Sequence, residues 1–209
     1  MQILVLGNDA QKEEFMASGV SPGTEIKWVA SEKEFLQFKK ADAFFDLLFQ
    51  ADNHRIAVLQ NLRPKPVFIN DTLNSIPAEL SFIRFNGWSS FLGRKIMEAS
   101  CANESVKNNA ETIMRSLNKR IEWTANIPGF ITGRVLAMII NEAYFALGEG
   151  VSTKKDIDTA MKLGTHYPFG PFEWSEKIGL KNIYSLLNEM SKTNKRYEPA
   201  PLLKNEALN

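Results

Sequence analysis

Cysteine and histidine are scarce in this chain. Cys101 is the only cysteine among 209 residues, which excludes an intrachain disulfide and a metal site built from several thiolates. This cysteine usage favours a reducing, cytoplasmic setting. The two histidines are His54 and His166. Because histidine alone has an unperturbed pKa suited to proton transfer near neutral pH, both are candidates for a general base.

A surplus of charge of either sign is also absent. The chain has 25 basic and 24 acidic residues, a net charge of +1, and its basic residues are scattered. Such a surface lacks the positive patch of a nucleic-acid-binding protein, so no nucleic-acid partner is expected. The apolar opening segment, residues 1–7, is too short for a signal peptide or a membrane span, and charged residues follow it closely. We therefore expect no membrane partner.

Residues 1–70 alternate short apolar runs with polar or amphipathic segments. The apolar runs predict strands at 3–6, 26–29, 44–49 and 66–69. Between them, Asp9 is the expected cap of a first helix, Ser31–Glu34 resembles a capping box that opens a second, and 52–62 predicts a third. This alternation indicates a parallel sheet covered by helices, with right-handed crossovers.

The order of elements changes after residue 80. Two strands are expected at 82–87 and 95–99, followed by a helix at 103–117 and a last strand at 121–125. Everything beyond the Pro128-Gly129 pair is predicted to be helical. The sequence therefore indicates an α/β domain over residues 1–125 and an all-α domain over residues 127–209.

The first helix of the second domain, expected over 130–147, is apolar on more than one face, so other helices or a partner subunit must cover it. Three further helices are predicted. The first runs over 153–163, is capped by Thr153 and Asp156 and ends at Gly164, and the others run over 172–178 and 181–190. The tail from Ser191, with prolines in a polar context, is expected to be loosely ordered.

Five motifs of the helical half resemble, in order and spacing, the C-terminal domain of the 3-hydroxyacyl-CoA dehydrogenase family. They are Pro128-Gly129-Phe130-Ile131-x-x-Arg134-x-Leu136, Asn141-Glu142-Ala143, Glu149-Gly150, the run from Asp156 to Gly164, and Tyr167-Pro168-x-Gly170-Pro171-Phe172-Glu173. The resemblance implies a truncated Rossmann-like parallel-sheet domain followed by a helical domain. It also implies a homodimer formed through the helical domain, an NAD site in the first domain and an acyl-CoA-like ligand in the cleft between the two.

The expected NAD site departs from the family pattern. A dinucleotide-binding turn needs glycines so that its backbone can approach a pyrophosphate, and only Gly7 is retained. The next two glycine positions hold Asp9 and Lys12, and the carboxylate of Asp9 would repel phosphate. We therefore predict that no cofactor binds, with NAD as the cofactor if the protein is active.

The catalytic positions implied by the resemblance are partly retained. Family members use a histidine base held by a glutamate, with a serine and an asparagine that bind the substrate oxygen. In this chain the base and asparagine positions fall on Ser89 and Gly133, neither of which can perform those roles. The glutamate position holds Glu98, and the serine position falls on Thr72 or Leu73, of which Thr72 offers a hydroxyl group.

Several roles remain open at this point. Glu98 is expected to pair with Arg84 or Arg134, His54 to be solvated, and His166 to face the cleft or decorate a turn. Trp88, Phe91 and Met97 either line a pocket or, as we favour, belong to the core. Two functions compete: a degenerate, non-catalytic family member, or an active NAD-dependent dehydrogenase that converts 3-hydroxyacyl-CoA to 3-oxoacyl-CoA.

Overall fold

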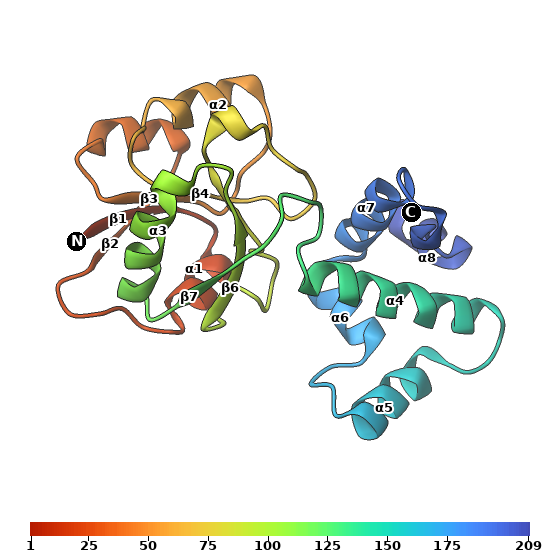
Figure 1. Ribbon diagram of the computed structural model, residues 1–209. Coiled ribbons are helices and arrows are strands. Elements are labelled where there is room, and N and C mark those ends of the chain that lie inside the picture. The colour runs from red at the N-terminus through yellow and green to blue at the C-terminus, as the bar shows by residue number, and fades with distance from the viewer. The chain divides into compact units, whose positions relative to one another are not determined.

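The computed structural model describes all 209 residues, which divide into one unit over Met1–Phe130 and a second over Ile131–Asn209 (Figure 1). None of the helices combines the length and the apolar character needed to cross a bilayer.

A seven-stranded sheet organises the first unit, with strand order β2-β1-β3-β4-β5-β6-β7. The β5–β6 pair is antiparallel and the other five pairs are parallel. This confirms the predicted α/β class. The strands are β1 (Gln2–Leu6), β2 (Glu25–Val29), β3 (Ala43–Asp46), β4 (Val67–Asn70), β5 (Ile83–Phe85), β6 (Ile96–Ser100) and β7 (Arg120–Trp123).

Helical segments cover both faces of the sheet (Figure 1). Helices α1 (Asp9–Met16) and α3 (Glu104–Ser116) pack on one face, and the 3₁₀ segment η1 (Glu32–Phe38) and helix α2 (Asn53–Gln60) on the other. Successive strand residues point to opposite faces, so Phe44 and Phe45 enter different core clusters. A short 3₁₀ segment, η2 (Ala78–Leu80), precedes β5.

The aromatic residues of the first unit are largely core. Phe45 stacks on Phe68 with ring centroids 4.2 Å apart. Trp88, Phe91 and Met97 are all buried, which confirms the core position favoured from the sequence.

Two of the predicted helix starts in the first unit are wrong in detail. Asn8, not Asp9, caps α1, because its side-chain oxygen accepts from the Gln11 N–H at 2.9 Å. The side chain of Ser31 makes no capping hydrogen bond, and Glu34 accepts instead from the Ala30 N–H at 3.1 Å. Residues 32–38 accordingly form a 3₁₀ segment rather than an α-helix.

The second unit is entirely helical. Its elements are α4 (Thr132–Gly148), α5 (Lys154–Thr165), α6 (Pro171–Ile178), α7 (Leu180–Ser191), the 3₁₀ turn η3 (Lys195–Tyr197) and α8 (Pro201–Leu208). Helix α4 packs against α6, α7 and α8. Thr153 caps α5 as predicted, but the helix continues through Gly164 to Thr165, and His166 takes the left-handed conformation that ends it.

The prediction of a loosely ordered tail is wrong. Helix α8 buries Leu203 and Ala207, and Asn141 on α4 binds the segment that precedes α8. The Asn141 carboxamide accepts from the Ala200 N–H at 2.8 Å and donates to the Glu198 carbonyl at 2.9 Å. A buried amide thus satisfies two backbone groups of the tail, which otherwise would have to be solvated.

We predict that replacing Asn141 with leucine, which has a similar shape, lowers the free energy of unfolding by about 2 kcal/mol, because both backbone groups lose their partner. Urea unfolding measures this loss, and hydrogen exchange in α8 should rise with it. The matched control is Asn188→Leu, at an exposed position of α7, which should stay within about 0.5 kcal/mol of the wild type. Equal stabilities of the two variants would contradict the assigned role of Asn141.

Candidate functional site

The side-chain carboxamide of Asn70 joins the carboxyl-terminal ends of strands β4 and β5. Asn70 donates to the carbonyls of Leu47 and Gly87, at 3.1 and 3.3 Å, and accepts from the Gly87 N–H at 3.0 Å. A Cβ at Gly87 would lie 2.6 Å from the Asn70 Cγ atom, so only glycine fits there. This contact sets the direction of the segment that leaves β5.

Next to this contact, a hydrogen-bonded chain joins Thr72 to Glu98 through Asn86. The Thr72 hydroxyl donates to Asn86 Oδ1 at 3.3 Å, and Asn86 Nδ2 donates to Glu98 Oε2 at 3.4 Å. The Trp88 N–H also donates to Asn86 Oδ1, at 3.4 Å. Thr72 and Asn86 are each only 2% exposed. The structure therefore brings together two of the residues predicted for the site and adds a third.

Sequence reasoning does not single out Asn86, although the strand pairing contains the signal. Phe85 lies opposite Ala99 in the antiparallel β5–β6 pair, and the Asn86 N–H donates to the Glu98 carbonyl at 3.1 Å. A hairpin register for the two predicted strands would have placed Asn86 across from Glu98.

Ser89 has a different partner. Its hydroxyl donates to Glu14 on α1 at 3.0 Å, and the Ser90 N–H donates to the same carboxylate. These bonds fix the loop after β5 onto α1. The structure thus directs the Ser89 hydroxyl to α1 and leaves Asn86 as the bridge to Glu98.

A cation lies close to this hydrogen-bonded chain. Burial lowers the pKa of Arg94, and the charge of Glu98 partly offsets that shift. The guanidinium stacks on Phe91, 4.0 Å from the ring centroid, and its Nε donates to the Ser90 carbonyl at 3.2 Å.

Arg84 is fully buried beneath the site. Its guanidinium donates to the carbonyls of Asp71 and Ile127 and to the side chain of Asn126, at 2.8, 2.9 and 2.7 Å. Burial lowers its pKa to about 10, with the Asp71 charge opposing the shift. Of the two arginines expected to pair with Glu98, Arg84 instead binds the loop after β4 to the segment after β7.

In the turn between β1 and α1, side chains of the turn itself accept hydrogen bonds from its backbone N–H groups. The Asn8 N–H donates to Gln11 Oε1 at 3.1 Å, the Gln11 N–H donates to Asn8 Oδ1, and Gln11 Nε2 donates to the Leu47 carbonyl at 2.9 Å. A Cβ at Gly7 would lie 2.9 Å from Leu47 Cδ1. Asp9 follows as an exposed carboxylate in the first turn of α1. Side chains of the turn thus satisfy N–H groups that would face a pyrophosphate in a dinucleotide site.

A buried ion pair stands beside this turn, and sequence reasoning missed it. Asp46, fully buried at the end of β3 and opposite Leu6, accepts two hydrogen bonds from Arg55, one of them 2.7 Å long. Burial raises the pKa of Asp46, while the hydrogen bonds and charge of Arg55 oppose that shift. The signal in the sequence was Asp46 itself, an acidic residue at the end of an apolar run that predicts a buried strand. The bidentate geometry indicates a structural pair.

The remaining predicted residues lie apart from this chain of hydrogen bonds or in the other unit. The His54 side chain is 65% exposed, with Nε2 3.9 Å from a Glu32 oxygen, as expected for a solvated residue. His166 is exposed at the end of α5. Gly133 is buried in the first turn of α4.

Residues of the two longest motifs in the helical unit form a cap in which α5 binds the start of α6. Buried Asp158 accepts from the N–H groups of Phe172 and Glu173, at 2.8 and 3.2 Å, and so caps α6 from α5. A Cβ at Gly170 would lie 2.2 Å from an Asp158 oxygen, so glycine is required. Glu173 accepts from the Gly170 N–H and pairs with Lys162.

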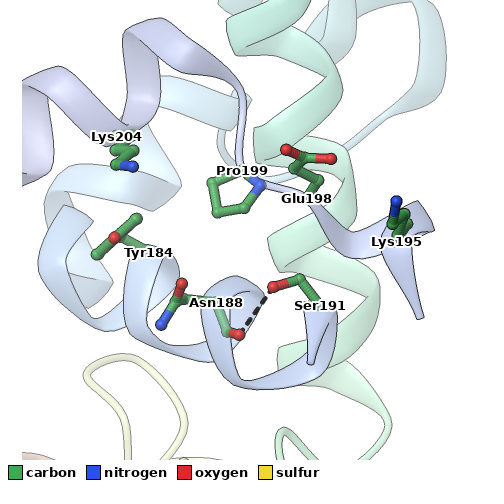
Figure 2. A pocket seen from close by; sticks show the side chains of 7 residues that line it. All are labelled: Tyr184, Asn188, Ser191, Lys195, Glu198, Pro199 and Lys204. Carbon is green, nitrogen blue, oxygen red and sulfur yellow. Dashed lines mark hydrogen bonds between the residues drawn. The ribbon is translucent and has the colours of Figure 1, made fainter. Parts of the chain in front are cut away.

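Neither the hollow in the helical unit nor the potential metal-ligating side chains provide a second site for chemistry. The hollow has a volume of about 290 Å³, and Figure 2 shows the side chains that line it, among which Ser191 donates to the Asn188 carbonyl. Lys195, Glu198 and Lys204 line it but are exposed to solvent, so it offers no dry environment for acyl chemistry. No group of three or more His, Cys, Asp or Glu side chains lies close enough to hold a metal ion.

Comparison with known proteins identifies the family. Residues 129–208 match the sequence model of the 3-hydroxyacyl-CoA dehydrogenase C-terminal domain. Over 115 residues, 54% of this chain and 24% of the relative, the chain is 38% identical to 3-hydroxyadipyl-CoA dehydrogenase of Escherichia coli. The helical unit belongs to the family of 3-hydroxyacyl-CoA dehydrogenase C-terminal domains. It is also 32% identical over 111 residues to 3-hydroxybutyryl-CoA dehydrogenase of Bradyrhizobium diazoefficiens, covering 52% of this chain and 38% of that one.

Solved structures extend the likeness to the first unit. The crystal structure of (S)-3-hydroxybutyryl-CoA dehydrogenase from Ralstonia eutropha matches with a TM-score of 0.75 at 19% identity, covering 98% of this chain and 92% of that one. At that identity the match shows the fold, which is Rossmann-like. By contrast, the chain spans only 24% to 41% of the length of the first curated relatives that it matches.

We predict that Arg84→Leu lowers the free energy of unfolding by about 3 kcal/mol, because three buried acceptors lose a charged donor. Urea unfolding measures the loss. The matched control is Arg115→Leu, whose side chain is 65% exposed and which should change stability by no more than about 0.5 kcal/mol. A loss for Arg84→Leu that is no larger than the control's would show that the buried guanidinium is not a structural centre.

Proposed function

We propose that this protein is a non-catalytic member of the 3-hydroxyacyl-CoA dehydrogenase family that binds an acyl-CoA-like ligand without turning it over. One observation carries the proposal: the side chain that bonds to Glu98 is the carboxamide of Asn86. In the family this glutamate is expected to hold a histidine base. We infer that Asn86, rather than Ser89, occupies the position of that base.

An asparagine at the position of the base supports the proposal that this protein has lost the proton-transfer step. Its carboxamide has no ionisation near neutral pH, so it cannot take the proton from a 3-hydroxyl group. Both of its polar ends already have partners, in Thr72 and Glu98. Loss of a general base lowers a rate by roughly 10² to 10⁴.

The turn between β1 and α1 supports the proposal that the cofactor binds weakly or not at all. Asn8 and Gln11 satisfy each other's N–H groups, and exposed Asp9 brings a negative charge to the start of α1. A pyrophosphate would have to displace these hydrogen bonds and approach a carboxylate, and both changes oppose binding.

An active NAD-dependent dehydrogenase is the second candidate. Retained Glu98 and Thr72 favour it, since both keep polar contacts at the same edge of the sheet. This alternative needs a base from elsewhere, and His166 is the candidate named from the sequence. It also needs a cofactor site that tolerates Asp9.

Ligand titration separates the two candidates. We predict no saturable change in NADH fluorescence up to about 1 mM, whereas calorimetry with acetoacetyl-CoA should show binding. Asp9→Gly, which removes the charge and restores a glycine, should strengthen any residual NADH binding. Saturable NADH binding by the wild-type protein would count against the proposal, and so would absence of acyl-CoA binding.

We further propose that the protein forms a homodimer through its helical unit. Ile131, which precedes α4, and Val135 in its first turn are 53% and 52% exposed, and half-buried Met138 and Phe145 continue this apolar stripe on either side of exposed Glu142. Positions spaced in this way share one helix face. A second copy would remove this apolar stripe from water, which is favourable in proportion to the area covered.

Val135→Glu should weaken the dimer by about 100-fold or more, because the two-fold axis would bring two like charges into an apolar contact. Light scattering at micromolar concentration measures the mass. The control is Asn188→Glu, which adds the same charge on an exposed position of α7 and should leave the mass unchanged. A wild-type monomer at that concentration would contradict the dimer.

A further inference from the structure

Strand β2 forms one end of the seven-stranded sheet and pairs only with β1. On the β1 side, the Glu25 N–H donates to the Met1 carbonyl at 2.8 Å. The backbone N–H and C=O groups of successive strand residues point to opposite sides of the strand, so those of Ile26 and Trp28 point away from β1. β2 therefore presents backbone groups without a strand partner at the edge of the sheet.

The neighbouring residues confine these groups to a short edge. The Thr24 N–H donates within the preceding turn at 3.1 Å, and the Ala30 N–H donates to Glu34 at 3.1 Å. Proline and bulges, two devices by which proteins keep edge strands from pairing, are both absent from β2. Charge is a third such device, and β2 carries it as Glu25 and Lys27.

The two charged side chains lie on the same face of β2. Ile26 and Trp28 pack against the core under α1 and α3, whereas Lys27 lies over the Phe38 ring of η1, 3.5 Å from its centroid. Glu25 is exposed and shares the face of Lys27, because alternate residues of a strand point the same way. An acidic and a basic side chain two residues apart match the same pair on an antiparallel copy of the strand.

From this arrangement we propose that β2 pairs antiparallel with β2 of a second copy of the chain, about a two-fold axis at Ile26. The two Ile26 residues then exchange backbone hydrogen bonds, and Glu25 of each copy lies opposite Lys27 of the other. Opposite charges at directly opposed positions stabilise a strand pair, and like charges destabilise it. An axis at Lys27 would bring two lysines opposite each other, so the charges also select the register.

This contact uses only residues of the first unit, so it is independent of the proposed function and of the apolar stripe on α4. The same patch serves both copies, so the interface is closed. One strand pair covers less area than the roughly 1,200 Å² of a standard interface. We therefore expect a weak dimer, with a dissociation constant on the order of 0.1 mM.

Amide hydrogen exchange measured at several protein concentrations tests the contact. Exchange at Ile26 and Trp28 should slow by about fivefold between about 10 µM and about 1 mM protein, because pairing removes their N–H groups from water. The Glu25 amide is the internal control. It is already bonded to the β1 side, so its exchange rate should not depend on concentration.

Charge reversal separates strand pairing from a general effect of charge. Lys27→Glu should weaken association by about tenfold, because both cross-strand pairs become repulsive. Combining Glu25→Lys with Lys27→Glu should restore association, because each pair again joins opposite charges. The matched control is Lys40→Glu, at an exposed position before β3, which should associate as the wild type does.

Three results would overturn the proposal. They are exchange at Ile26 and Trp28 that does not depend on concentration, equal association of Lys27→Glu and the wild type, and failure of the double variant to restore association. Concentration-dependent protection at Ile121 and Trp123 in place of Ile26 and Trp28 would assign the contact to β7, the other edge strand, and would overturn the proposal as well.

Discussion

The buried guanidinium of Arg84 is the contact on which the geometry of the candidate site depends. It holds the carbonyl of Asp71 and, on the other side, Asn126 and the carbonyl of Ile127. Thr72 follows Asp71 directly, and its carbonyl accepts from the Gly129 N–H at 2.7 Å. Because Arg84 fixes this loop, the Thr72 hydroxyl can reach Asn86. Leaving a buried cation without hydrogen-bond acceptors is costly, so these three contacts hold the loop in place.

The family motifs of the helical unit have a structural explanation that does not involve catalysis. Asp158 caps α6, Gly170 leaves room for the Asp158 carboxylate, and Glu173 completes the cap. Together these contacts join α5 to the start of α6. These motifs can therefore be kept for docking the helices whether or not the protein is catalytic, and they explain why the C-terminal domain is recognisable in this chain.

Much of the fold was predictable because the strands are buried runs between turn signals. The α/β class, every strand and the main helices follow from those runs. Errors arose where two residues competed for one role. Asn8 and Asp9 can each cap a helix, and only the contact with Gln11 decides between them. The tail is ordered because Asn141 accepts from the Ala200 N–H, 59 residues further along the chain. No local sequence pattern reveals that contact.

The site was less predictable than the fold because its residues also meet through contacts between distant parts of the chain. Glu98 and Thr72 were found through the family resemblance, but Asn86 becomes visible only with the β5–β6 register. The Asp46–Arg55 pair likewise joins a strand end to a helix. Side chains that meet through tertiary packing leave little trace in periodicity.

Turnover is the most direct test of the central claim that Asn86 replaces the base. The measurement follows NADH absorbance while the protein acts on 3-hydroxybutyryl-CoA with saturating NAD. We predict no turnover above the protein-free rate for the wild type and no change on Glu98→Gln. Turnover by the wild type that Glu98→Gln abolishes would contradict it.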